Sequence, residues 1–377
     1  MKYIEEFRDP ELAQNLAKGI AEAVDPGRDY AFMEFCGGHT HAIARYGVED
    51  LLPDNIRMIH GPGCPVCVLP VARVDKAIAL ATDHDVILCT YADLMRVPGS
   101  KFDSLIKARS RGADIRMVYS VTDALKIAEG NPDRQVVFFA IGFETTTPPT
   151  AVALRIAKAK GLKNFSVHCN HVLTPAAMRA ILGAPGDPTR ITIDGFVGPS
   201  HVSAVIGMQP YHEFTEDYAK PVVIAGFEPL DVMQAILQLV QQVNDGRADV
   251  ENEYARAVTE EGNAKAIALM DEVFDLRDSF EWRGLGSVPH SALKIAPDYA
   301  GFDAELRFDV QTPAPRENKA CACGDVLRGE KTPEQCKLYG DPCTPENPLG
   351  ACMVSSEGAC AAQWTYGRFR QQDLVAE

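Results

Sequence analysis

The sequence is short of basic side chains, of long apolar runs and of phosphate-binding loops. Its 377 residues include 37 Lys and Arg against 52 Asp and Glu, a formal net charge of −15. This balance disfavours nucleic acid as a partner, because nucleic acids attract basic surfaces. The longest stretch without Asp, Glu, Lys or Arg, residues 195–212, contains Gly, Pro and His that suit no membrane span. No GxGxxG or GxxxxGKS/T motif follows a strand candidate, which disfavours a nucleotide-binding protein.

The opening segment MKYIEEFRDPELAQNL is acidic, has a helical pattern and contains no apolar core. It therefore does not resemble a secretory signal. We expect a cytoplasmic protein with no membrane span.

Cysteine is the residue type that this sequence has in excess. There are eleven cysteines, and six of them fall between residues 321 and 360. A disulfide framework is typical of small secreted chains, whereas a chain of this length can bury its own core. In a reducing compartment, clustered cysteines indicate metal or thiol chemistry.

Short apolar runs alternate with segments of helical period along most of the chain. The strand candidates begin at Tyr30, Ile56, Val86, Ile115, Val136, Ser166, Ile193 and Pro221. Their spacing suits one strand plus one returning helix, which predicts parallel sheets.

We expect two similar α/β domains, each with a four-stranded parallel sheet and flanking helices, at residues 29–130 and 131–228. The boundary is placed in the polar, turn-rich segment 128–135, between the fourth and fifth strands. Residues 1–28 with 229–377 form the expected third unit, helical and ending in the cysteine-rich tail. A (β/α)₈ barrel is the alternative for the eight strands.

Most strand candidates are followed by segments with reactive side chains: CGGHTH, GPGCPVC, YADLMRVPG, GFETTTP, CNHVLTP, GPSHVS and GFEPLD. Ligands collect at the carboxyl ends of parallel strands, so these segments are expected to face one cleft. Cys36, with His39 and His41, is a candidate ligand for a soft transition metal; the alternative is a buried thiol at a strand end with histidines that cap a helix. Glu144 and His201 are candidates for acid–base work, and helix-terminal structural roles are their alternatives.

Cys64 and Cys67 form a CxxC motif directly before an apolar helical run. A helix N-terminus stabilises a thiolate, so this pair is a candidate for cycling between dithiol and disulfide. Cys89 and Cys169 lie inside apolar strand candidates and are expected to be core residues.

The six tail cysteines follow the pattern CxCx12Cx6Cx8Cx7C. Paired CxxC knuckles and a nearby His are missing, which makes a zinc ribbon a poor fit. An iron–sulfur cluster needs four thiolates and tolerates irregular spacing, so a cluster is favoured over zinc or a purely structural role. Spacing alone does not select the four ligands.

Four motifs together resemble one family, the hydrogenase maturation protein HypD family. They are FCGGHTH at residues 35–41, GPGCPVC at 61–67, GFETTTP at 142–148 and CTPENPLGACMVSSEGAC at 343–360. The resemblance spans essentially the whole chain and implies two similar α/β domains with a cluster-bearing third domain. It also implies a scaffold that assembles the Fe(CN)2CO group of nickel–iron hydrogenases together with a HypC-like chaperone. A HypE-like partner, whose C-terminal thiocyanate is made with HypF, would donate the cyanide.

The resemblance also implies a role for each cysteine group. Cys36 would hold the iron that is being assembled, and Cys64 with Cys67 would be a redox-active pair. The implied [4Fe-4S] ligands are Cys321, Cys336, Cys343 and Cys360, which leaves Cys323 and Cys352 as a second thiol pair beside the cluster. A competing interpretation is a cluster-dependent protein disulfide reductase, and a third is a nucleotide-binding α/β protein with a zinc tail.

Overall fold

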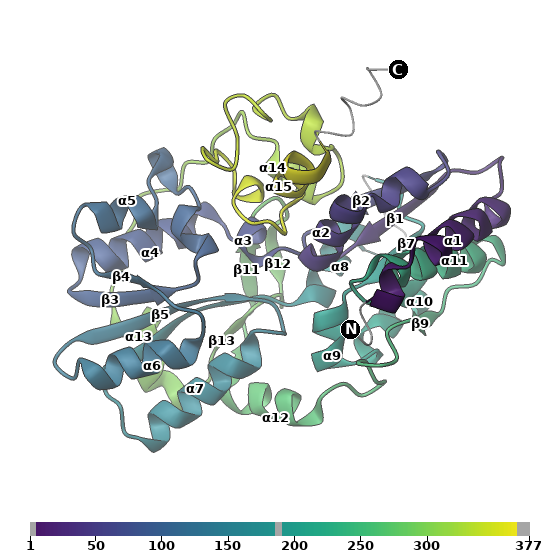
Figure 1. Ribbon diagram of the computed structural model, residues 1–377. Coiled ribbons are helices and arrows are strands. Elements are labelled where there is room, and N and C mark those ends of the chain that lie inside the picture. The colour runs from purple at the N-terminus through teal and green to yellow at the C-terminus, as the bar shows by residue number, and fades with distance from the viewer. Residues whose placement is uncertain (1–4, 185–190, 368–377) are drawn as a thin grey trace.

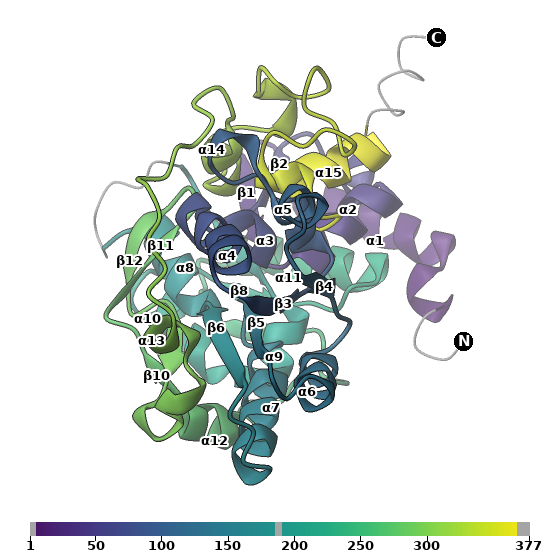
Figure 2. The same cartoon turned by 90° about the vertical axis from the view of Figure 1, so that its left-hand side faces the viewer.

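The computed structural model describes residues 5–184 and 191–367, arranged as two open parallel sheets with flanking helices and a cysteine-rich tail (Figure 1). The tail lies above the region where the two sheets approach each other, and a view turned by 90° shows the same arrangement (Figure 2). No helix in these two ranges has the length and apolar character needed to cross a membrane.

The five-stranded sheet has the order β2-β1-β7-β8-β9, and all its neighbouring strands are parallel. Its strands are β1 (Tyr30–Glu34), β2 (Ile56–His60), β7 (Gly195–Gly198), β8 (Val222–Ile224) and β9 (Val250–Asn252). The helices that accompany it are α1 (Pro10–Ala23), α2 (Gly37–Tyr46), α9 (Ser200–Ile206), α10 (His212–Glu216) and α11 (Pro229–Asn244). Helices α1 and α11 pack against each other, and α11 also contacts β7 and β8.

The four-stranded sheet has the order β4-β3-β5-β6 and is also parallel throughout. Its strands are β3 (Val86–Thr90), β4 (Ile115–Met117), β5 (Gln135–Gly142) and β6 (Phe165–His171). Its helices are α4 (Val71–Asp83), α5 (Leu105–Ser110), α6 (Val121–Gly130) and α7 (Thr147–Ala159). Helix α8 (Thr174–Leu182) follows β6 and is joined to α10 by the Arg179–Glu213 ion pair. Every residue of β3 and β6 is buried, as expected for parallel strands covered on both faces.

All eight predicted strands are present, but the predicted grouping into strands one to four and five to eight is wrong. Strand β5 pairs with β3, and β7 pairs with β1, so the chain leaves the first sheet after β2 and returns to it at β7. The junction at residues 130 and 131 therefore lies inside one sheet. The spacing of strand candidates sets the length of a crossover but does not show which strand the returning strand pairs with. The strands form two open sheets, so the alternative of a (β/α)₈ barrel is wrong.

The segment after α11 adds a ninth strand and small antiparallel pairs. Helix α12 (Ala264–Val273) follows β9 and a turn in this part of the expected helical unit. Strands β10 (Phe274–Leu276) and β13 (Leu293–Ile295) pair, as do β11 (Ser279–Trp282) and β12 (Gly286–Pro289). The remaining helices are α3 (Pro65–Val68), α13 (Ala304–Arg307), α14 (Cys323–Leu327) and α15 (Ala359–Ala362), with short 3-10 turns between them.

The helical layer of the four-stranded sheet can be tested with a matched pair of leucines. Leu154 on α7 is fully buried, whereas Leu306 on α13 is 72% exposed. We expect Leu154→Ala to lower the free energy of unfolding by about 3 kcal/mol, because it leaves a cavity, and Leu306→Ala by less than about 1 kcal/mol. Urea titration of both variants measures the difference, and equal losses would contradict the described packing.

Candidate functional site

A cavity of about 520 Å³ lies where the carboxyl ends of strands from both sheets meet. Its walls come from the loops after β1, β2, β3, β4, β5 and β7, and from tail residues 355–357. This confirms that several of the predicted segments face one cleft. The segments after β6 and β8 do not contribute to its lining among the described residues.

Cys36 lines this cavity at the N-cap of α2 and is 8% exposed. Burial, and then the negative charge of Glu34, raises the pKa of the Cys36 thiol to about 12, while backbone amides of Gly38 and His39 oppose the shift. The thiol is therefore protonated at neutral pH. A bound metal cation would displace this proton, as it does for other thiolate ligands.

Glu34, the last residue of β1, is a fully buried carboxylate that the sequence analysis missed. One oxygen accepts the Cys36 backbone N–H at 2.7 Å, and the other accepts the hydroxyl of Thr40 and lies 3.0 Å from Nδ1 of His60. Burial opposes protonation of His60, but the hydrogen bond and charge of Glu34 raise its pKa on balance. Glu34 thus ties β1, α2 and β2 together beside Cys36.

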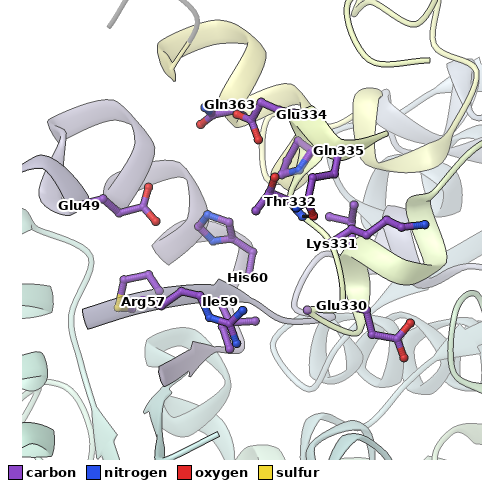
Figure 3. A pocket seen from close by; sticks show the side chains of 14 residues that line it. Glu49, Arg57, Ile59, His60, Glu330, Lys331, Thr332, Glu334, Gln335 and Gln363 are labelled. Atoms are coloured by element: carbon purple, nitrogen blue, oxygen red, sulfur yellow. Dashed lines mark hydrogen bonds between the residues drawn. The ribbon is translucent and has the colours of Figure 1, made fainter. Parts of the chain in front are cut away.

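His60 also lines a second pocket, which lies between β2 and the tail (Figure 3). Tail residues Lys331, Thr332 and Glu334 line the other side of this pocket. Its lining mixes both signs of charge.

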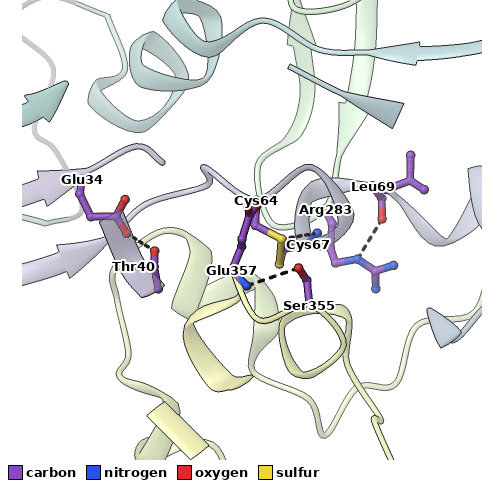
Figure 4. Close-up of a disulfide and its surroundings, with 8 residues drawn as sticks. All are labelled: Glu34, Thr40, Cys64, Cys67, Leu69, Arg283, Ser355 and Glu357. Carbon is purple, nitrogen blue, oxygen red and sulfur yellow. Dashed lines mark hydrogen bonds between the residues drawn. A yellow bond between two sulfur atoms is a disulfide. The ribbon is translucent and has the colours of Figure 1, made fainter. Parts of the chain in front are cut away.

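Cys64 and Cys67 form a disulfide whose Cα atoms are 5.2 Å apart (Figure 4). Cys64 is the N-cap of the one-turn helix α3, and both cysteines are buried behind the cavity wall formed by Gly63, Pro65 and Val66. A Cβ atom at Gly63 would lie 2.4 Å from the backbone nitrogen of Cys36. Only glycine permits this approach, so the loop carrying the disulfide touches the backbone of Cys36.

The predicted histidines lie in three different environments. His201 lines the cavity and packs on Phe227, with ring centroids 4.2 Å apart. His39 is buried outside the lining, and its Nε2 lies within hydrogen-bond distance of the carbonyl oxygens of Ala225 and Gly226, at 3.1 and 2.9 Å. His41 instead contacts the ring of Tyr366 in the tail.

Glu144 is buried and does not line the cavity. Its carboxylate accepts hydrogen bonds from the backbone N–H of Thr174 at 2.9 Å and from the Thr174 hydroxyl at 3.0 Å, at the start of α8. Burial raises the pKa of Glu144 to about 7 despite these bonds. These contacts of Glu144 with Thr174 are those of a carboxylate at a helix terminus, the structural alternative for this residue, and Glu144 does not reach the cavity.

Two further carboxylates in the cavity were not predicted. Asp93 follows β3, and Glu357 comes from the tail and lies against Gly37, where an added Cβ would be 2.8 Å from Oε2. The protein around Glu357 raises its pKa by burial and then by the charges of Asp93 and Glu34. A thiol, an imidazole and two carboxylates therefore line one cavity, although no three of them converge on a single metal position.

The six tail cysteines occupy one neighbourhood. Burial, followed by the charges of neighbouring tail thiols, raises the pKa of Cys360, and the same two causes raise that of Cys321 to about 12. Backbone N–H groups point at two of the sulfurs, from Ala322 to Cys336 at 3.5 Å and from Leu349 to Cys343 at 3.4 Å.

Cys323 and Cys352 are hydrogen-bonded to each other, which lowers the pKa of Cys323 and raises that of Cys352. Helix α14, which carries Cys323, and the 3-10 turn Ala351–Met353 both pack against α3 of the CxxC motif. This thiol pair is therefore adjacent to the Cys64–Cys67 disulfide.

A [4Fe-4S] cluster fits these donors by chemistry. Thiolates that receive backbone N–H bonds are characteristic of iron–sulfur sites. A [4Fe-4S] cluster would need four cysteine ligands, one for each iron. Across residues 5–184 and 191–367, no three His, Cys, Asp or Glu side chains converge as ligands for a single metal ion. The fit of a [4Fe-4S] cluster to the tail therefore rests on the presence of thiol donors and on their closeness to one another.

Comparisons with known proteins agree on one family. The HypD family, described as "Hydrogenase formation hypA family", matches residues 11–367. A hydrogenase maturation factor HypD of Rhizobium leguminosarum is 64% identical over 375 residues, which covers 99% of this chain and 97% of the relative. Its counterpart in Cupriavidus necator is also 64% identical, and that in Escherichia coli is 46% identical, each over the full length of both chains.

The buried carboxylate beside Cys36 can be tested by substitution. We expect Glu34→Ala to lower the free energy of unfolding by about 3 kcal/mol, since it strands the Cys36 N–H and the Thr40 hydroxyl. Glu34→Gln keeps one accepting oxygen and should lose about 1 kcal/mol. Glu22→Ala, which removes an exposed carboxylate, is the control. Chemical denaturation gives the order, and a Glu34→Ala loss no larger than that of the control would disprove the role.

Proposed function

Because the chain belongs to the HypD family of hydrogenase maturation factors, we propose that it holds iron at Cys36 while cyanide and carbonyl are attached. The observation that carries this proposal is the contact between two loops: Cys36 lines the cavity, and Gly63 of the CxxC segment lies against its backbone. A thiol that lines the cavity and a cysteine pair directly behind the same wall therefore lie side by side. The partners proposed from the resemblance are a HypC-like chaperone and a HypE-like cyanide donor.

The iron is the substrate of this site. Its first protein ligand would be the Cys36 thiolate, formed when the cation displaces the proton that burial and Glu34 retain. Asp93 and Glu357 add negative charge to the cavity, which favours a cation there. Cys36 is 8% exposed but lines the cavity, and small ligands would reach its thiol from there.

The CxxC pair would supply the electrons that release cyanide. Cleavage of a thiocyanate, R–S–CN, by two thiols gives R–SH, hydrogen cyanide and a disulfide, so atoms and electrons balance. Cyanide then binds iron as the anion and its proton leaves. The Cys64–Cys67 disulfide of this structure corresponds to the oxidised form of the pair, which must be reduced before another cyanide is released.

The tail would hold a [4Fe-4S] cluster through Cys321, Cys336, Cys343 and Cys360. When bound, such a cluster supplies single electrons to neighbouring thiols. Cys323 and Cys352, which hydrogen-bond to each other beside α3, would exchange with the Cys64–Cys67 pair. The alternative function, a cluster-dependent protein disulfide reductase, uses the same thiols but requires no iron at Cys36.

The iron site is tested by Cys36→Ala. We expect the complex with the chaperone to lose its infrared bands of iron-bound cyanide and carbonyl, because the anchoring thiolate is gone, while the visible absorption of the tail cluster persists. Cys89→Ala, which removes a fully buried thiol from β3, should keep both signals. Bands that survive in Cys36→Ala would remove the scaffold function and leave the reductase alternative.

The CxxC pair is tested by Cys64→Ala. We expect this variant to bind the chaperone and iron but to show no cyanide bands, since one thiol cannot deliver two electrons as a disulfide. Co-purification reports partner binding, infrared spectra report the ligands, and Cys89→Ala again serves as the control. Normal hydrogenase maturation with Cys64→Ala would contradict the redox role.

A further inference from the structure

A basic pocket lies beside the tail, on a chain whose net charge is −15. We use the name basic pocket for the hollow lined by Lys101, Phe102, Arg283, Arg316, Lys319 and Leu349. Four of these six side chains are cationic, and Glu317 is the one carboxylate in the lining among the described residues. Lys101, Arg316 and Lys319 are exposed.

Two residues in the lining of the basic pocket are hydrogen-bonded directly to tail cysteines. Leu349 contributes to its lining, and the backbone N–H of this residue donates to the Cys343 sulfur at 3.4 Å. Asn318, also in the lining, accepts the backbone N–H of Cys321 at 3.0 Å. Cys321 is the one partly exposed thiol among the tail cysteines; the other five are buried.

Arg283 links this pocket to the CxxC helix. The residue is 8% exposed, its backbone N–H donates to the Val68 carbonyl at 2.8 Å, and its Nε donates to the Leu69 carbonyl at 3.0 Å (Figure 4). Its Nη2 atom is buried without a hydrogen-bond partner among the described residues. Its Nη1 atom lies 3.7 Å from a carboxylate oxygen of Glu317, so one exposed carboxylate of the same lining pairs with this buried cation.

The tail connects the basic pocket to the cavity of Cys36. Leu349 lines the pocket, Ser355 and Glu357 line the cavity, and Cys352 lies between them in the sequence. The Cys323–Cys352 pair therefore belongs to the same tail segment as residues that line both the pocket and the cavity.

The surface loop at this pocket is held in an unfavourable backbone conformation. Lys101 and Phe102 both have positive φ values, 58° and 59°, and Phe102 is 49% exposed. Hydrogen bonds fix this loop, from Gly99 N to Asp103 O at 2.8 Å and from Arg316 N to Ser100 Oγ at 2.8 Å. Strain of this kind persists mainly at functional sites, and an exposed aromatic ring among cations is typical of a protein interface.

We propose that the basic pocket is the docking surface for a small acidic protein that carries electrons. The inference deepens the proposed function, on which it rests, because the disulfide must be reduced for a further round. Two molecules of a reduced one-electron carrier and two protons convert the Cys64–Cys67 disulfide into two thiols, and two carriers leave oxidised. Complementary charge steers such a carrier to this face of an otherwise acidic protein.

Binding is tested with a reduced acidic [2Fe–2S] ferredoxin as the probe. The double variant Lys101→Glu/Lys319→Glu reverses two exposed charges of the basic pocket. Lys18→Glu/Lys265→Glu, which reverses two exposed charges on α1 and α12, is the matched control. At low ionic strength we expect the double variant to bind about tenfold more weakly, and the control to bind as wild type does. Added salt should shrink the difference. Equal binding by the double variant and the control would overturn the proposal, as would equal wild-type affinity for basic cytochrome c.

The second readout is the rate at which free thiols form at Cys64 and Cys67, followed by alkylation and mass spectrometry. With reduced ferredoxin, the double variant should be slower by about the same factor as its loss of affinity. With dithiothreitol, which needs no docking surface, wild type and variant should react alike. Unchanged ferredoxin rates in the double variant would overturn the docking site. Failure of dithiothreitol to release these thiols in wild type would instead count against the redox part of the proposed function.

Discussion

One buried carboxylate organises the wall of the cavity. Glu34 ends β1, accepts the backbone N–H of Cys36 and the hydroxyl of Thr40, and lies opposite His60 across the strand pair. A charge in this position is stable only while its partners stay in place, since an unpaired buried carboxylate is strongly unfavourable. The same bonds therefore hold β1, β2 and α2 together and fix the backbone of Cys36. With that backbone fixed, Gly63 can press the CxxC segment against it.

Two regions of opposite charge lie on either side of the tail. The cavity holds Asp93 and Glu357, with Glu34 behind it; burial, and then the charges of Glu34 and Glu357, raise the pKa of the Cys36 thiol. The basic pocket, in contrast, gathers cations around Arg283. An acidic cavity attracts a metal ion and repels an acidic protein, whereas the basic pocket does the reverse. With iron bound at one surface and the electron carrier at another, the carrier would dock without competing for the site at Cys36.

The sequence predicted local features well and long-range contacts poorly. Buried parallel strands are near-continuous apolar runs, so all eight predicted strands could be found, and Cys89 and Cys169 were correctly placed in the core. The grouping of strands failed because a crossover of the same length can return to either sheet. Glu34 was missed because a charged residue that ends a strand normally faces water. Glu357 was missed because its contact with Gly37 joins segments far apart in the chain, and Glu144 was overvalued because only the fold shows that Thr174 binds it.

The observed order of the strands explains the position of the CxxC motif. Had each half of the chain formed its own sheet, residues 61–71 would have been a turn within one sheet. They are instead the crossover from β2 to the four-stranded sheet, so α3 lies between the two sheets and beneath the tail (Figure 1). From that position the segment touches Cys36 on one side, and helix α14 and the 3-10 turn of Cys352 on the other. The topology thus places the CxxC pair between Cys36 and the Cys323–Cys352 pair.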